Sequence, residues 1–318
     1  MHIDVFNGDA DGICALVQLR LAQPLKSKLV TGVKRDIQLL DKVSAQENDQ
    51  ITVLDISLEK NRTALDKVLA QGANVFYVDH HQSGEIPVHP NLTTLINTDA
   101  NICTSLLMDQ HLEGKFRAWA VTAAFGDNLN ESAEQAAVPL ALTSTQLNKL
   151  KDLGNCINYN GYGSNLDDLH FHPDVLFQEL VTYPSPFDFM TDNVSVYQEL
   201  LTGYSDDMQL GLQIKPEYQT DAVSVIILPD EAWARRVSGV LGNELANLKP
   251  NCAHAIFSYT EKGDYQISVR APLTNKTGAD ELCSQFPTGG GRKSAAGINH
   301  LPLDQLSAFI SAFEQKYR

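Results

Sequence analysis

Two short segments of the chain carry side chains that could support metal-dependent chemistry. Asp9 and Asp11 lie on the turn Asn7-Gly8-Asp9-Ala10-Asp11-Gly12, and the triplet Asp79-His80-His81 combines a carboxylate with two imidazoles. Two carboxylates on one tight turn repel each other and need a compensating cation. Carboxylate oxygens and imidazoles suit Mn²⁺ or Mg²⁺ better than a metal that prefers thiolates. These residues indicate a site for a hard divalent cation.

Each segment follows a short apolar run that is typical of a buried strand. Strands are predicted over Ile3–Phe6, Ile51–Asp55 and Val75–Val78, and helices over Ile13–Leu21 and Leu58–Leu69. Strands that alternate with helices predict βαβ units on a mostly parallel sheet, where ligands bind at the carboxyl ends of the strands. An aspartate after a strand is also a common helix N-cap, so each residue taken singly fits that role as well.

The rest of the chain shows a helical segment and then a second α/β pattern. Helices are predicted at 103–112, 116–125, 132–142 and 145–153, and residues 154–184 are predicted as loop with one helix. The later pattern predicts strands at 222–228, 254–260 and 265–269, helices at 231–248, 279–286 and 303–313, and a glycine turn at 289–291. The fold class is therefore α/β with two domains. A mostly parallel sheet flanked by helices occupies 1–192, a connecting helix or linker 193–215, and a smaller α/β domain 216–318.

Charge and composition limit the classes of partner. The 318 residues include 24 Lys and Arg against 39 Asp and Glu, a net charge of -15. Long nucleic acids are held by many cationic contacts, so a protein that tracks long strands is disfavoured, whereas a small anion in a local basic pocket is not. Five scattered cysteines without a Cys-x-x-Cys pair fit a reducing compartment. With no apolar leader or membrane segment evident, we expect a cytoplasmic protein without a membrane partner.

Five motifs in order resemble the DHH phosphoesterase superfamily, with the DHH-associated C-terminal domain found in RecJ-type exonucleases, nanoRNases and dinucleotide phosphodiesterases. The first is the turn at 7–12, and the third, Val78-Asp79-His80-His81, names the family. The others are Leu54-Asp55-Ile56-Ser57, Ala124-Phe125-Gly126-Asp127-Asn128 and Gly289-Gly290-Gly291-Arg292-Lys293-Ser294-Ala295-Ala296-Gly297. The resemblance covers nearly the whole chain. It implies a metal-binding catalytic domain at 1–192 and a substrate-binding domain at 216–318.

The resemblance also implies a role for each motif residue. Two divalent metal ions, Mn²⁺ first and Mg²⁺ or Co²⁺ as alternatives, would share the ligands Asp9, Asp11, Asp55, His80 and Asp127. His81 would contact phosphate or orient the nucleophile, and Asp79 would hold an imidazole in one tautomer. Two ions activate a water molecule and neutralise charge on the phosphoryl group in the transition state.

One position departs from the pattern of the family. Many members carry a histidine ligand four residues before the first aspartate of the motif, and here that residue is Val5. RecJ-type members use a polar residue two positions before that aspartate, which here is Asn7. Its amide oxygen is a weak, neutral ligand, so Asn7 is an additional candidate; a turn-stabilising role fits it equally.

The C-terminal motif indicates an anion site. The backbone N–H groups of Gly289, Gly290 and Gly291 could approach a phosphate closely, and Arg292, Lys293 and Ser294 follow at once. Arginine binds phosphate in a bidentate fashion and stays charged at every physiological pH. Arg270 resembles the arginine of this domain that contacts the substrate phosphate.

The sequence thus predicts a phosphodiesterase that hydrolyses short linear 5′-phosphorylated dinucleotides, of the pGpG or pApA kind, to mononucleotides. The alternatives are a phosphatase acting on 3′-phosphoadenosine 5′-phosphate, a cyclic dinucleotide phosphodiesterase, and a nucleotide-binding module without catalysis. The expected partner is a small nucleotide and no long nucleic acid. The base preference, and whether the chain is a monomer or a homodimer, stay open.

Overall fold

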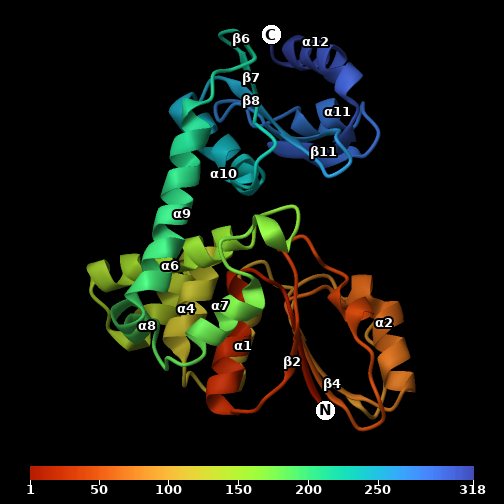
Figure 1. Ribbon diagram of the computed structural model, residues 1–318, viewed down its shortest axis with the longest axis vertical. Coiled ribbons are helices and arrows are strands. Elements are labelled where there is room, and N and C mark those ends of the chain that lie inside the picture. Colours follow the sequence, from red (N-terminus) through yellow and green to blue (C-terminus); the bar gives the residue numbers. More distant parts are fainter. The chain divides into compact units, whose positions relative to one another are not determined.

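Five parallel strands form the sheet of the first unit, which comprises Met1–Gly203 of the 318 residues that the computed structural model describes (Figure 1). The strand order is β2-β1-β3-β4-β5. The bounds are β1 His2–Phe6, β2 Lys28–Val30, β3 Gln50–Leu54, β4 Asn74–Asp79 and β5 Leu92–Ile96. The three predicted strands are confirmed as the centre of the sheet. The edge strands β2 and β5 were not predicted, because their runs are short or interrupted by threonines.

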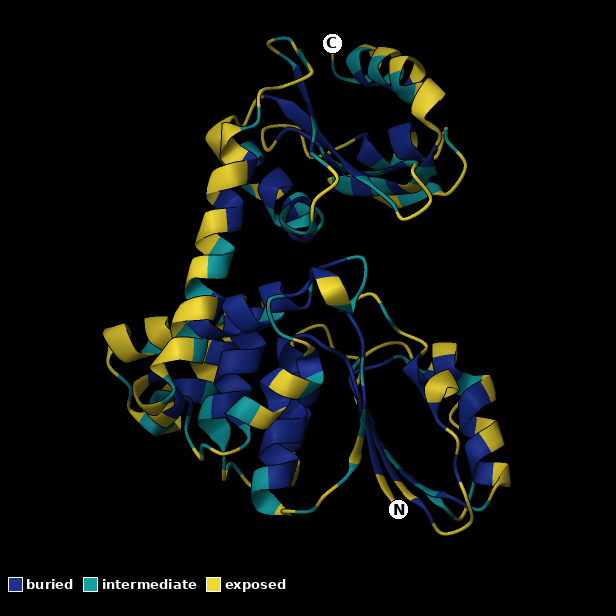
Figure 2. Ribbon diagram, viewed as in Figure 1, coloured by how far each residue is buried: buried dark blue, intermediate teal, exposed yellow.

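Two helices cover opposite faces of this sheet (Figure 1). The apolar face of helix α2 (Leu58–Ala70) packs against β1, β3 and β4, whose buried side chains on this face include Val5, Val53 and Tyr77. Helix α1 (Ala10–Ala22) lies against the other face and is buried continuously from Ala10 to Arg20 (Figure 2). A helix that is buried on every side must be enclosed by other elements, and α3, α4, α6 and α7 contact α1.

Further helices complete the first unit. Their bounds are α3 Thr104–His111, α4 Arg117–Gly126, α5 Asn130–Ala137, α6 Ser144–Asn160, α7 Pro173–Leu180, α8 Pro186–Asp192 and the first part of α9 Val194–Gln213. Single-turn 3₁₀ helices lie at Leu39–Lys42, Val138–Leu140 and Leu166–Asp168. The prediction of loop after 153 is wrong over 154–160, because α6 continues through buried Cys156, Ile157 and Tyr159. The predicted helix at 132–142 is instead α5 followed by the 3₁₀ turn.

A close helix crossing joins α4 and α6. A Cβ atom added to Gly154 would lie 2.0 Å from the carbonyl oxygen of Thr122, and one added to Gly126 would lie 2.6 Å from the carbonyl oxygen of Gly154. Only glycine permits this separation at either position. Gly126 is the last residue of α4, so the crossing fixes where the chain leaves that helix.

The division between the two units falls within α9, between Gly203 and Tyr204. Gly203 lies close to the ring of His170 in the first unit, where an added Cβ would be 2.7 Å away. In the second unit, Asp207 forms a buried ion pair with Arg236 of α10 (Ala232–Leu248), with Nε and Oδ2 2.6 Å apart. The segment predicted as a connecting helix or linker over 193–215 is therefore one helix whose two parts pack in different units.

A mixed six-stranded sheet forms the second unit, Tyr204–Arg318, in the order β10-β11-β9-β8-β7-β6. The bounds are β6 Tyr218–Gln219, β7 Val223–Ile227, β8 Ala253–Tyr259, β9 Tyr265–Arg270, β10 Gly289–Arg292 and β11 Ala295–Leu301. Besides α10, this unit contains α11 Ala279–Cys283, a 3₁₀ turn at Leu303–Gln305 and α12 Leu306–Tyr317. The predicted α/β class with two units, the first built on a parallel sheet, is confirmed.

The glycine run is the main correction in this unit. Gly289–Gly291 was predicted as a turn, but these residues form most of β10, which pairs antiparallel with β11. Pairing along β11 supplies the backbone hydrogen bonds that outweigh the low strand preference of glycine. The turn is formed instead by Lys293 and Ser294, which connect β10 to β11. Across both units, no helix combines the length and the apolar composition needed to span a membrane.

Candidate metal centre

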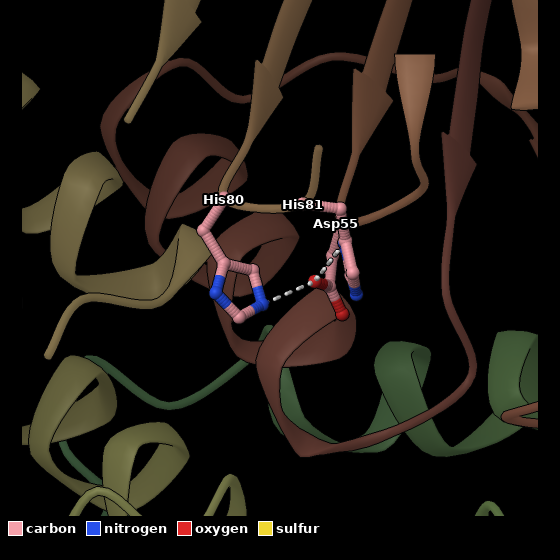
Figure 3. A group of neighbouring side chains, drawn as sticks. All are labelled: Asp55, His80 and His81. Atoms are coloured by element: carbon pink, nitrogen blue, oxygen red, sulfur yellow. Dashed lines mark ion pairs between the residues drawn. The ribbon is translucent and has the colours of Figure 1, made fainter. Parts of the chain in front are cut away.

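Four side chains meet at the carboxyl edge of the parallel sheet. His80, directly after β4, places its Nε2 atom 3.5 Å from Oδ1 of Asp55, which follows β3 (Figure 3). The same nitrogen lies 3.8 Å from Oδ2 of Asp11 and 3.9 Å from Oδ2 of Asp127. Neighbouring parallel strands end at one edge, which explains why residues distant in sequence converge.

The carboxylate of Asp11 is held by the start of helix α3. Its Oδ2 accepts a hydrogen bond from the backbone N–H of Thr104 and its Oδ1 accepts one from Ser105, both at 2.7 Å. The Ser105 hydroxyl donates to the carbonyl oxygen of Asp11 at 2.8 Å. Unpaired N–H groups at a helix N-terminus stabilise an anion, so α3 keeps Asp11 in one orientation.

Asp55 occupies a backbone conformation that few side chains adopt. Its φ is 58°, in the left-handed region, and its N–H donates to the carbonyl oxygen of Val78 at 3.1 Å. Its Oδ1 accepts a hydrogen bond from the Thr104 hydroxyl at 3.3 Å. Backbone strain of this kind is found at functional sites, where the surrounding structure holds it in place. Here it directs the Asp55 carboxylate toward His80 and His81 (Figure 3).

His81 is oriented by its neighbour in the motif. Its Nδ1 lies 2.7 Å from Oδ1 of Asp79, a fully buried residue at the end of β4, and 3.8 Å from Oδ1 of Asp55. The hydrogen bond to Asp79 raises the pKa of His81 against the lowering effect of burial. The side chain of His81 is 44% exposed, so its ring is accessible to a ligand.

Asp9 lies beside this group but has protein partners for both oxygens. Its Oδ1 caps α1 by accepting from the N–H groups of Asp11 and Gly12, at 3.0 and 3.1 Å. Its Oδ2 pairs with the ammonium of Lys34 at 2.7 Å. The N-cap role that an aspartate at this position could take is thus observed, together with an ion pair.

Asn7, the additional ligand candidate, contacts the same lysine through the backbone. Its Nδ2 donates to the carbonyl oxygen of Lys34 at 3.2 Å, while its buried Oδ1 has no hydrogen-bond partner. Val5, at the position of the histidine found in many family members, is fully buried in the core beneath α2 and offers no donor atom.

The crowded carboxylates shift one another's protonation. Burial, followed by the charges of Asp11 and Asp9, raises the pKa of Asp127 to about 7 and raises that of Asp55 well above its ordinary value. Burial would also raise the pKa of Asp9, but the Lys34 ammonium reverses the shift and lowers it. Clustered negative charge of this kind favours the binding of a cation.

The residues present fit a divalent metal ion. Candidate ligand groups are Asp11, His80 and Asp127, and Asp55, His80 and His81. These groups combine carboxylate oxygens with imidazole nitrogens, the donors that Mn²⁺ and similar ions accept. The buried Oδ2 of Asp79 and Oδ1 of Asn7 also lack partners. Of the predicted ligands, Asp11, Asp55, His80 and Asp127 are brought together around the His80 imidazole. Asp9 belongs to the same cluster, because its side chain interacts with that of Asp55 and its charge helps to raise the pKa of Asp55 and Asp127.

The predicted substrate residues lie at one end of the second unit's sheet. Arg270 and Ser294 line a pocket together with Asn243, Asn247 and Lys276. The guanidinium of Arg270 donates to Asn243 Oδ1 at 2.6 Å and to the Gly239 carbonyl oxygen at 3.1 Å, which fixes its orientation. Arg292 and Lys293 are exposed where β10 ends. β10 is an edge strand, so its outer backbone side has no strand partner.

Lys34, Thr104 and Ser105 are contacts of the centre that sequence reasoning missed. None of them follows one of the predicted strands or belongs to a recognised motif. The signal that could have identified Lys34 is the pair of cations Lys34-Arg35, which comes shortly after β2, the strand that pairs with β1 and its acidic turn. Sequence spacing alone does not show that this segment folds back over the turn.

Comparison with known proteins identifies the fold. No profile of a known protein family and no curated protein matches the sequence. Among solved structures, RecJ from Thermus thermophilus in complex with Mn²⁺ aligns over 99% of this chain with a TM-score of 0.64 and 16% identity. The chain spans about half of that protein, 51% of its length.

Two further structures match over 99% of this chain. Exonuclease RecJ bound to manganese has a TM-score of 0.59 and 16% identity, with 89% of its own chain covered. The pGpG-specific phosphodiesterase PggH from Vibrio cholerae has a TM-score of 0.55 and 17% identity, with 100% of its chain covered. The chain therefore has the fold of the RecJ exonucleases and of PggH, which is the fold that the resemblance implied.

Proposed function

We propose that this protein is a metal-dependent phosphodiesterase that hydrolyses short linear 5′-phosphorylated dinucleotides, such as pGpG or pApA, to mononucleotides. The observation that carries the proposal is the convergence of Asp11, Asp55, Asp127 and His80 at one edge of the sheet, with His80 Nε2 within 3.9 Å of all three carboxylates. The shared fold with RecJ and with the pGpG phosphodiesterase PggH supports the same class of reaction.

The four converging side chains would hold the divalent ion, with Mn²⁺ as the first candidate. When bound, such an ion lowers the pKa of a coordinated water and neutralises charge on the phosphoryl group. The N–H groups of α3 hold both oxygens of Asp11 in the orientation that this binding needs. The Thr104 hydroxyl orients one oxygen of Asp55 in the same way.

His81 would act on the phosphate or on the leaving oxygen. Asp79 occupies Nδ1, so the proton available for exchange with substrate is the one on Nε2. The raised pKa of His81 favours the protonated imidazole, which can donate to a phosphate oxygen. In this role His81 is a catalytic residue and Asp79 a positioning residue.

The second unit would recognise a terminal phosphate. Arg292 and Lys293 are exposed cations in a protein of net charge -15, and Ser294 and Arg270 border the pocket beside them. β10 is the edge strand of the sheet, so a phosphate could approach its outer side near Gly291, whereas the N–H of Gly289 is engaged by the carbonyl oxygen of Phe286. A few cations beside a largely acidic surface suit a short nucleotide, because a long polyanion would be repelled over most of its length.

The proposal is tested by product analysis with Mn²⁺ and a panel of substrates. The panel contains pGpG, pApA, longer 5′-phosphorylated oligonucleotides, cyclic dinucleotides and 3′-phosphoadenosine 5′-phosphate, with products separated by chromatography. We expect rapid release of mononucleotides from the linear dinucleotides and slow cleavage of longer chains. Release of inorganic phosphate as the main product would instead establish a phosphatase, and absence of all products would contradict the enzyme assignment.

Variants localise the activity to the two sets of residues. Asp55→Asn should abolish turnover while leaving dinucleotide binding measurable. Arg292→Ala combined with Lys293→Ala should raise the KM for dinucleotides with a smaller effect on kcat. Lys262→Ala removes an exposed cation from the turn between β8 and β9 and is the matched control, with unchanged kinetics.

A further inference from the structure

Lys34, which the sequence analysis did not identify, places a positive charge beside the carboxylates of the centre. Its Nζ lies 2.7 Å from Oδ2 of Asp9 and 3.9 Å from Oδ1 of Asp127. It also donates a hydrogen bond to Oδ1 of Asn158 at 2.7 Å and lies 5.9 Å from the ring centroid of Tyr162. The ammonium is therefore held between two of the carboxylates to which the resemblance assigns metal binding.

The chain around Lys34 is built to hold it there. Its N–H donates to the carbonyl oxygen of Gly161 at 2.8 Å, and its carbonyl oxygen accepts from Asn7 Nδ2 at 3.2 Å. Gly161 itself packs tightly, since an added Cβ would lie 3.0 Å from the carbonyl oxygen of Gly8. A lysine that merely covered the surface would not have its backbone bonded on both sides and its side chain bonded at the tip.

A metal ion bound to Asp9 would compete with this ammonium. Both cations would contact Oδ2 of Asp9, and two cations on one carboxylate oxygen repel each other. The other oxygen of Asp9 is engaged in capping α1. Val5 supplies no imidazole to compensate, because its side chain is buried in the core beneath α2.

We propose that Lys34 replaces one of the two metal ions that the resemblance implies, so that the centre binds a single divalent ion through Asp11, Asp55, His80 and Asp127. This inference rests on the proposed function for its chemistry but concerns only the cation count. Lysine binds phosphate as a compact point charge, so its ammonium supplies beside Asp9 and Asp127 the charge that an ion would otherwise carry.

The test is the number of Mn²⁺ ions bound per chain, measured by native mass spectrometry and by titration calorimetry on the full protein. The wild type should bind one ion. Lys34→Met removes the charge at nearly constant length and should raise the number to two, with the second ion bound more weakly. Lys34→Arg retains the charge and should bind one. Lys42→Met, at an exposed lysine of the following 3₁₀ turn, is the matched control and should also bind one.

Electron paramagnetic resonance of the bound Mn²⁺ gives a second readout. The wild type should show the hyperfine pattern of an isolated ion, and Lys34→Met at saturating Mn²⁺ should show that of a coupled pair. Two ions in the wild type, or one ion in a folded Lys34→Met protein, would overturn the inference. If Lys34→Met fails to fold, Lys34→Gln takes its place, and the wild-type count decides independently of either variant.

The two proposals fail separately. One bound ion with no hydrolysis of any nucleotide would refute the proposed function and leave the Lys34 inference standing. Two bound ions with rapid dinucleotide hydrolysis would do the reverse.

Discussion

Oδ1 of Asp79 lies 2.7 Å from Nδ1 of His81, and both residues belong to the motif that follows β4. Asp79 is completely buried, whereas the side chain of His81 is 44% exposed. The contact therefore joins the interior of the sheet to a side chain that a ligand can reach. Because Asp79 is part of strand β4, this contact fixes the orientation of the His81 ring relative to the sheet.

Asp79→Asn should lower the pKa of His81, because the hydrogen bond to Asp79 is the main cause of its upward shift from 6.5. A histidine pKa raised by folding adds stability that is complete below the unfolded value and disappears as pH rises through the folded value. The stability difference between wild type and variant should thus be larger at about pH 5.5 than at about pH 8. NMR titration of the His81 ring and thermal melting at the two pH values measure this, with Asp41→Asn as an exposed control. An unchanged His81 titration curve would contradict the assignment.

Asp127→Asn should stabilise the metal-free protein at alkaline pH. Folding raises the pKa of this carboxyl from 3.8 to about 7, so the folded state keeps a proton that the unfolded chain releases. Because the unfolded chain loses this proton first, the free energy of unfolding falls as pH rises from 3.8 to about 7 and stays at the lower value above that pH. We expect a gain of about 1–2 kcal/mol at pH 8 in a chelator and almost none near pH 4. Urea unfolding gives both numbers, and a loss of stability at pH 8 would refute the argument.

The same variant should respond less to added Mn²⁺. A ligand that binds only the folded state stabilises it by mass action, and Asp127 is one of the groups around His80. The wild type should therefore show the larger rise in melting temperature on Mn²⁺ addition.

Gly126→Ala should weaken Mn²⁺ binding without touching a ligand. The new methyl group would lie 2.6 Å from both the Cβ of Ala10 and the carbonyl oxygen of Gly154, which forces α4 away from α1 and α6. Asp127 directly follows and would move with the end of α4. We expect a loss of about 1–3 kcal/mol in stability together with a lower affinity for Mn²⁺.

Gly239→Ala is the matched control, because an added Cβ there meets no atom within 4 Å. Alanine in the interior of α10 should stabilise the protein by about 0.5–1 kcal/mol and leave Mn²⁺ affinity unchanged. Equal behaviour of the two variants would show that the helix crossing does not position Asp127.

Gly290→Ala and Gly291→Ala should differ sharply. Gly291 has a φ of 145°, and an added Cβ would lie 2.5 Å from the Cα of Ala296, so this variant should lose about 1–3 kcal/mol of stability. Gly290 meets no atom within 4 Å, so alanine there should leave the fold intact. If a phosphate approaches the backbone of β10, Gly290→Ala should nevertheless raise the KM for dinucleotides. Unaltered kinetics in that variant would remove the glycine backbone from the binding site.

The sequence predicted the part of the centre that depends on strand ends. Apolar runs that alternate with helices located β1, β3 and β4 and placed Asp55 and His80 at strand ends. That these strands lie side by side, which brings the two residues together, is shown by the structure. The resemblance added Asp127, which follows a helix and has no strand signal of its own. The helix at 103–112 was predicted, but the contact of its first turn with Asp11 was not, and neither was the contact of Lys34 with Asp9. Both contacts depend on how irregular segments fold over the sheet. The glycine strand β10 was missed because its conformation comes from pairing with β11 rather than from its own residues.

The left-handed backbone conformation of Asp55 makes aspartate an unfavourable residue at this position unless its carboxylate is needed. Glycine would relieve the strain there, worth about 1–3 kcal/mol, and would also remove a charge that its neighbours repel. Mutational drift in a lineage that no longer needed a cation would therefore tend to replace this aspartate. Among distant sequences that share the fold, an aspartate kept at this position would distinguish working hydrolases from descendants that have become binding proteins.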